Sequence, residues 1–138
     1  MDDITMLENK FHEISYFGLR LAIGVTFVVV GYIKFDPGFD TYLLQLNLPP
    51  DLRYLFALEE FIPGLLLIAG ILTRISASVL SVVMLGIIFY IDKASQFIGS
   101  NGAEYPVLIL AGSLFIITIG PGRISLSHLI KKIPRFLQ

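Results

Sequence analysis

The sequence predicts an all-α integral membrane protein, a four-helix bundle in which residues 1–138 form one membrane domain. Hydrophobic residues make up 55% of the chain and charged residues 15%, with a mean hydropathy of +0.79, a composition typical of chains solvated mainly by lipid. Four apolar stretches recur, each a few residues short of the roughly 20 that span a bilayer. The stretch at 75–91 carries no charge, whereas a helix of a soluble bundle has a polar face.

The predicted spans cover residues 15–34, 55–73, 75–92 and 104–120. The segment before the first span, MDDITMLENKFHE, is acidic and lacks the basic start of a cleavable signal peptide. Between the first two spans, two proline-containing turns flank a short amphipathic run at 39–46, which we expect to lie along the membrane interface. Only Thr73 and Arg74 join the second and third spans, which predicts an antiparallel hairpin.

The distribution of basic residues predicts a cell-membrane protein with both termini in the cytoplasm, because Lys and Arg are enriched on that side. Seven basic residues lie on the side shared by the termini and three on the opposite side. The seven are Lys10, Arg20, Arg74, Arg123, Lys131, Lys132 and Arg135, and the three are Lys34, Arg53 and Lys93. The tail SLSHLIKKIPRFLQ reads as a basic amphipathic segment suited to an anionic inner leaflet. A solvated tail is the alternative.

Two adjacent carboxylates, Glu59 and Glu60, interrupt an otherwise apolar stretch. At 100° per residue, Glu60 and Lys34 each end a helix stripe that contains glycine, so both stripes are expected to face the bundle interior. A charge near hydrocarbon usually points inward to a partner or a watery cavity. Lys34 is the expected partner of Glu60 or of Glu104. The predicted outer-rim polar cluster consists of Lys34, Glu60, Asp92 and Glu104. The alternative places Glu59 and Glu60 among lipid headgroups.

Three basic residues are expected at the inner rim: Arg20, Arg74 and Arg123. The alternative for Arg20 is a side chain that extends along the helix to the interface. The chain has no cysteine, and its two histidines, His12 and His128, lie outside the spans. No disulfide, iron–sulfur cluster, bis-histidine haem or metal site is therefore predicted. The net charge of −1 gives no electrostatic basis for nucleic-acid binding.

Three segments, GLRLAIGVTFVVVGYIKF, ALEEFIPGLLLIAGILTR and NGAEYPVLILAGSLFIITIGPGRISL, resemble the DoxX family of small four-helix membrane proteins, which includes membrane subunits of thiosulfate:quinone oxidoreductases. The resemblance runs from about Gly18 to Leu126. Its most specific parts are the acid before the run ending in GILTR and the closing GPGRISL. Ser127 departs from the pattern, because similar proteins often have aspartate there. The family's recurring polar positions match Arg20, Lys34, Glu60, Arg74, Glu104 and Arg123.

The resemblance implies a membrane subunit of a multisubunit, quinone-linked oxidoreductase complex, with other membrane subunits and the lipid bilayer as partners. This chain is then at most one component of the enzyme, and no cofactor is expected on the chain itself, although a quinone is expected at the level of the complex. Its headgroup is expected at the outer rim, flanked by Phe61, Tyr90 and Tyr105. One alternative is a non-catalytic accessory or scaffolding subunit of a larger respiratory enzyme or metalloenzyme. A second is a small-solute or proton pathway along Glu60 and Glu104.

Overall fold

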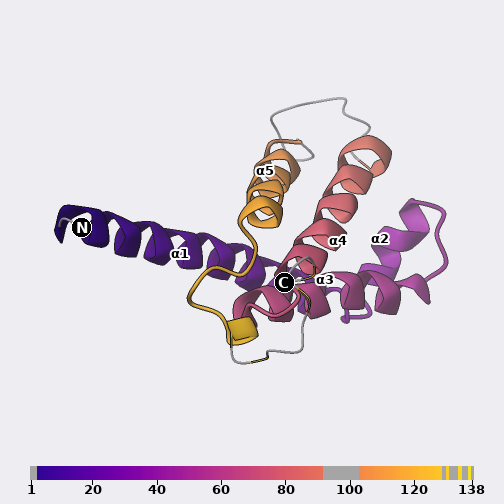
Figure 1. Cartoon of the computed structure of the whole chain (residues 1–138). Coiled ribbons are helices and arrows are strands. Elements are labelled where there is room, and N and C mark those ends of the chain that lie inside the picture. Colours follow the sequence, from indigo (N-terminus) through magenta and orange to yellow (C-terminus); the bar gives the residue numbers. More distant parts are fainter. Residues whose placement is uncertain (1–2, 92–102, 129, 131–133, 135–136, 138) are drawn as a thin grey trace.

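The protein is described here by a computed structural model that covers residues 3–91, 103–128, 130, 134 and 137, and all regular structure in this part of the chain is helical (Figure 1). The all-α class is therefore confirmed for these residues. Five α-helices are present in them: α1 (Asp3–Ile33), α2 (Phe39–Gln45), α3 (Leu52–Ala69), α4 (Thr73–Gly86) and α5 (Glu104–Ile119). A π-helical turn, η1 (Ile87–Ile91), continues α4, and a 3-10 turn, η2 (Leu126–His128), follows α5.

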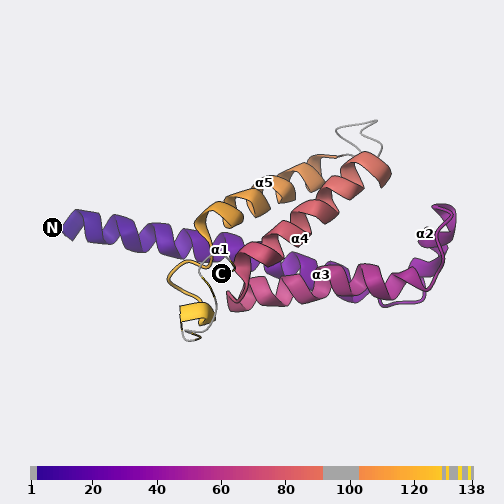
Figure 2. The ribbon, with the colours of Figure 1, turned by 45° about the vertical axis from the view of Figure 1, so that its right-hand side comes forward.

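Helices α1 and α3 form the most extensive helix pair and lie side by side in both views (Figures 1 and 2). Glycines allow their backbones to touch. A Cβ added to Gly24 would lie 2.9 Å from the carbonyl oxygen of Gly64, and one added to Gly31 would lie 2.7 Å from the amide nitrogen of Phe61. Real Cβ atoms do not approach backbone so closely, so glycine is required at both positions. The glycine stripe of α1 therefore faces inward, as the sequence predicts.

Helices α4 and α5 form a second pair, which lies against the first (Figure 2). A buried apolar cluster joins the two pairs, with members from α1, α3, α4 and α5. Its members are Tyr16, Ile23, Phe27, Leu67, Ala77, Leu80, Met84, Ile109 and Ile116. The cluster fixes the four long helices relative to one another and leaves α2 at one end of the molecule (Figure 2).

Helix α3 ends at Ala69, earlier than the predicted limit at residue 73. Gly70 adopts a φ of 72°, a conformation that favours glycine, and the amides of Gly70 and Ile71 donate to the carbonyls of Leu67 and Leu66 at 3.2 and 3.0 Å. These two hydrogen bonds form a Schellman motif, which ends a helix. Because the helix stops here, Arg74 belongs to α4 and does not share a helix with Glu60.

Helix α1 begins well before the predicted first span at residue 15, and its N-terminal part projects beyond the other helices (Figures 1 and 2). The sequence offers no glycine or proline between Asp3 and Phe17 to end a helix there. The projecting part exposes large apolar side chains, including Leu7, Phe11 and Ile14. The acidic N-terminal segment is thus a continuation of α1.

Two helical segments are long and apolar enough to cross a membrane, Met6–Ile33 and Thr73–Tyr90. Helix α5 is apolar but shorter. Helix α3 is 18 residues long and carries three charged residues, Arg53, Glu59 and Glu60. All four long helices expose large apolar side chains on their outer faces, such as Val29, Leu65, Val82 and Leu108. An apolar outer surface of this extent is unusual for a monomeric soluble protein.

Candidate functional site

The ion pair between Lys34 and Glu60 lies at the end of the α1–α3 pair. The Nζ of Lys34 is 2.7 Å from Oε1 of Glu60, and the side chain of Glu60 is only 1% exposed. Of the two partners that the sequence offers Lys34, the structure provides Glu60. The local sequence positions both groups, because Lys34 directly follows the last turn of α1 and Glu60 lies on the buried face of α3 with Ala57 and Gly64.

The second oxygen of Glu60, Oε2, is buried and has no hydrogen-bond partner among the residues that the structure describes. An unpaired buried carboxylate oxygen is costly and needs an explanation in a native protein. Pro63 lies on the same helix and has no amide hydrogen to donate to the carbonyl of Glu59, as another residue at this position would. The acidic turn of α3 therefore presents more acceptors than the described part of the chain satisfies.

A cavity of about 710 Å³ lies beside the Lys34–Glu60 pair, and every α-helix contributes to its walls. Its polar side chains are Lys34, Glu59, Glu60, Tyr42, Tyr90 and Tyr105. The other lining residues are apolar and include Phe27, Val30, Phe39, Leu43, Phe56, Met84 and Ile87. A mostly apolar cavity of this size with a few polar groups has the composition of a site for a small organic ligand.

Two of the three predicted ring-flanking residues line this cavity. Tyr90 lies in the π-helical turn η1 and Tyr105 lies in the first turn of α5. Phe61 is not among the lining residues. Its ring packs edge-to-face on that of Phe35 with 6.0 Å between the centroids, because residue 61 follows Glu60 by 100° around the helix and so points to another face. Single π-helical turns occur often at functional sites.

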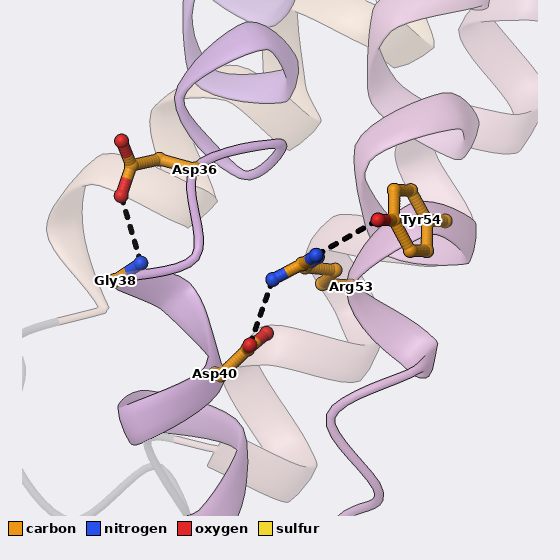
Figure 3. Close-up of polar contacts among 5 residues, drawn as sticks. All are labelled: Asp36, Gly38, Asp40, Arg53 and Tyr54. Atoms are coloured by element: carbon orange, nitrogen blue, oxygen red, sulfur yellow. Dashed lines mark hydrogen bonds and ion pairs between the residues drawn. The ribbon is translucent and has the colours of Figure 1, made fainter.

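Helix α2 covers the cavity with Phe39, Tyr42 and Leu43. The amide of Gly38 donates to Oδ1 of Asp36 at 2.7 Å in the turn that precedes α2. Nη1 of Arg53, at the start of α3, donates to Oδ2 of Asp40 on α2 at 2.7 Å, and its Nη2 donates to the Tyr54 hydroxyl (Figure 3).

At the opposite end of the α1–α3 pair, near the middle of α1, Arg20 is buried and binds the segment that follows α5. Its Nη1 donates to the carbonyl of Pro121 and its Nη2 to that of Ile124 at 2.6 Å. The guanidinium also lies over the ring of Phe17, 5.4 Å from its centroid. Arg20 is 1% exposed, so the alternative that its side chain extends to the interface is wrong. Its carbonyl partners hold it inside the fold.

Tyr16 adds a second contact to the same segment, because its hydroxyl donates to the carbonyl of Gly120. Arg74 lies on the other side of this turn, and a Cβ on Gly120 would come within 3.1 Å of its Nε. Arg20 and Arg74 therefore both lie beside the turn formed by Gly120 and Pro121. Arg123 differs from both, since its side chain is 79% exposed and lies 3.8 Å from Glu13.

The two remaining predicted residues of the outer rim are less closely tied to the cavity. Glu104 opens α5 and has an interaction of its own, but the cavity is lined by its neighbours Tyr105 and Pro106. Asp92 lies outside the described residues. Among the residues that the structure does describe, no group of three His, Asp or Glu side chains is arranged to hold a metal ion.

The sequence pattern of the DoxX family matches residues 16–93, more than half of the chain. The chain belongs to the DoxX family. The match runs from Tyr16 in α1 to just beyond η1, so it includes Arg20, Lys34 and Glu60. Family membership and the apolar helices together indicate a membrane environment for this DoxX protein.

Two curated relatives extend the comparison. A Bacillus subtilis protein named "Putative oxidoreductase CatD" is 29% identical over 126 residues, which cover 90% of this chain and 92% of that protein. A Haemophilus influenzae protein named "Uncharacterized protein" is 35% identical over 97 residues, or 68% of this chain and 64% of that protein. No solved structure matches the chain.

Sequence reasoning missed three parts of these sites: Tyr16, the covering role of α2 and the π-helical turn. A tyrosine within an apolar span was a usable signal for Tyr16, because a buried hydroxyl needs an acceptor. The amphipathic pattern of 39–46 predicts a segment along the membrane interface, but it carries no signal that this segment also covers a cavity. Nothing in the letters of 87–91 distinguishes a π-turn from a continued α-helix.

Proposed function

We propose that this DoxX protein is an integral membrane subunit of a multisubunit, quinone-linked oxidoreductase complex, and that its cavity binds the quinone headgroup. In this proposal the chain carries no redox centre of its own and receives no electrons by itself. The observation that carries the proposal is the buried Glu60 carboxylate, which is paired with Lys34 through one oxygen and lies beside a largely apolar cavity. The Bacillus subtilis relative is named an oxidoreductase, which supports the same class of function.

The residues of the cavity fit a quinone in size and chemistry. A volume of about 710 Å³ falls within the range of small-molecule pockets, and the apolar walls suit a lipophilic ring and tail. A bound quinone supplies an acceptor of two electrons and two protons. Glu60 contributes a carboxylate oxygen that can hold and pass a proton within the cavity. Lys34 keeps the other oxygen of that carboxylate in place, and Tyr90 and Tyr105 offer hydroxyl groups at the wall.

The proposal includes four membrane spans, formed by α1, α3, α4 with η1, and α5, with both termini in the cytoplasm. The N-terminal part of α1, helix α2 and the basic tail then lie at the interfaces. The absence of cysteine makes a direct test simple, because each introduced cysteine is unique. A cysteine at Asp36, which is exposed in the turn after α1, should react with an impermeant maleimide on intact cells. One at Glu8, exposed near the N-terminus, should react only after lysis, and the reverse pattern would overturn the orientation.

Activity is tested in the intact complex, isolated in mild detergent with its subunits identified by mass spectrometry. Glu60→Gln keeps the shape of the side chain and removes the proton acceptor. We expect quinone reduction to fall by about a hundredfold or more, which is the lower end of the range for loss of a general acid or base. Co-purification of the partner subunits should be unchanged.

The matched control is Glu8→Gln, the same chemical change at an exposed position of α1. It should leave both quinone reduction and assembly unchanged. If Glu60→Gln behaves like this control, the cavity takes no part in quinone turnover, and the scaffolding alternative replaces the proposal. A complex without quinone activity even for the natural sequence would have the same consequence.

A proton or solute pathway along Glu60 and Glu104 has less support. Further along α5, on the same face as Glu104, lie Leu108 and Phe115. Their side chains are 72% and 52% exposed on the outer surface. The buried face of α5 is formed by Pro106, Ile109, Ser113 and Ile116. A continuous internal stripe of polar groups below Glu104 is therefore not formed within this single chain.

A further inference from the structure

A second hollow lies far from the cavity, at the end of the molecule where Arg20 is buried. It is an open groove of about 330 Å³ between α1, the end of α3 and the segment that follows α5. Its walls are apolar except for Arg20 and Ser125, and they include Phe17, Ile68 and Ala69. In Figure 1 the segment after α5 turns back beside α1 and the end of α3. The groove shares no lining residue with the cavity at Glu60.

Arg20 brings a buried positive charge to this groove, and no carboxylate in the described part of the chain forms an ion pair with it. The ion pairs found in the described part of the chain are Lys34–Glu60, Arg53–Asp40 and Arg123–Glu13, so none of them involves Arg20. Its contacts are two backbone carbonyls, which are neutral acceptors. A buried charge is costly unless an opposite charge accompanies it.

The guanidinium also has hydrogen-bonding capacity left. Arginine has five N–H donors in a planar fork, and the carbonyls of Pro121 and Ile124 each accept one bond. Nε is buried with no hydrogen-bond partner in the residues that the structure describes. Phosphate oxygens match this fork geometry well, and arginine binds them more specifically than lysine does.

We propose that this groove binds an anionic phosphodiester amphiphile, with a phosphate oxygen on Arg20 and the hydrocarbon against Phe17 and Ile68. The apolar walls favour a lipid over a free anion, because hydrocarbon is the part of the ligand that they can hold. The site lies at the end of the molecule that also holds Arg74 and Arg123. It is independent of the quinone proposal, since neither site uses a residue of the other.

The experiment measures lipid binding to the purified full-length protein in a neutral detergent. Phosphatidylglycerol, phosphatidylcholine and inorganic phosphate are added separately, and thermal unfolding is followed by circular dichroism. Saturating phosphatidylglycerol should raise Tm by about 5 °C, as a ligand specific to the folded state does. Phosphatidylcholine and inorganic phosphate should give smaller shifts. Native mass spectrometry should show phosphatidylglycerol retained on the protein.

Two variants separate a specific site from general attraction. Ala69→Leu fills the groove and leaves Arg20 in place, so it should fold normally and lose both the Tm shift and the retained lipid. Arg123→Gln removes an exposed positive charge outside the groove, and it should keep both. The proposal is overturned if phosphatidylcholine stabilises the protein as much as phosphatidylglycerol, or if Ala69→Leu still responds. A shift with inorganic phosphate as large as that with phosphatidylglycerol would overturn the lipid as ligand.

Discussion

The two ends of the α1–α3 pair each hold a buried charge, but the partners of the two charges differ in kind. At one end, Lys34 pairs with Glu60 at 2.7 Å beside a large cavity, and one carboxylate oxygen keeps no partner in the described chain. At the other end, Arg20 is held by the carbonyls of Pro121 and Ile124. At the first end, the unpaired oxygen of Glu60 is able to accept a proton. At the second end, Arg20 joins segments that are about a hundred residues apart in the chain.

This difference separates a group that can change its protonation state from one that cannot. The guanidinium of Arg20 stays protonated and its carbonyl partners do not titrate. The contacts of Arg20 are therefore fixed once the chain folds. A carboxylate can gain or lose a proton, and the group beside it can move. We therefore expect substitutions at the Arg20 end to act mainly on stability. Substitutions at the Glu60 end should act on stability through the ion pair and on activity through the free oxygen.

Arg20→Met should have the largest effect on stability. It removes two hydrogen bonds to carbonyls that then lie without their donor, and it frees the segment after α5 from α1. A hydrogen bond to a charged group contributes about 1.5–3 kcal/mol, so the loss of two such bonds should cost about 3–6 kcal/mol. The free energy of unfolding should fall by that amount in SDS titrations of the detergent-purified protein followed by circular dichroism. A loss below about 1 kcal/mol would show that Arg20 does not fasten the two segments.

The sequence predicted much of the Glu60 end and less of the Arg20 end, for a physical reason. Helical periodicity places Lys34 and Glu60 on glycine-bearing faces of two helices. Because their charges are opposite, the sequence predicts that they pair. Arg20 binds backbone carbonyls, which every residue has, so no side chain marks Pro121 or Ile124 as its partners.

Helix ends and ring directions were predicted less well. The stop at Gly70 depends on a left-handed backbone conformation, whereas the apolar run continues past it to Leu72. Phe61 is predicted to flank the quinone headgroup, but it follows Glu60 by 100° around the helix and does not line the cavity. The cavity itself arises from five helices meeting, and no local pattern encodes its volume.

Substitution of the two members of the Lys34–Glu60 pair should have a smaller and unequal effect on stability. Lys34→Leu leaves a carboxylate buried without its cation, and we expect a loss of about 3 kcal/mol. Glu60→Leu leaves a lysine that is 15% exposed and can extend its flexible stem toward water, so about half that loss is expected. The double variant should recover part of the sum, which measures the coupling between the two groups. Strictly additive losses would mean that the pair does not form.

The smallest effect on the free energy of unfolding is expected for the ion pair of Glu13 and Arg123. This pair lies on the surface, near the contacts of Arg20 with Pro121 and Ile124. Its atoms are 3.8 Å apart and the Arg123 side chain is 79% exposed, so water and salt screen the attraction. The pair nevertheless adds a backbone contact, because the amide of Arg123 donates to Oε2 of Glu13 at 3.0 Å. Arg123→Gln keeps that amide and should change the free energy of unfolding by less than about 0.5 kcal/mol. Glu13→Gln keeps an acceptor oxygen and should change it little more. Because salt screens a surface ion pair, the small loss should be smaller still at high salt than at low salt. A loss near that of Arg20→Met for either variant would mean that the surface pair, and not the buried guanidinium, holds this end of the protein together.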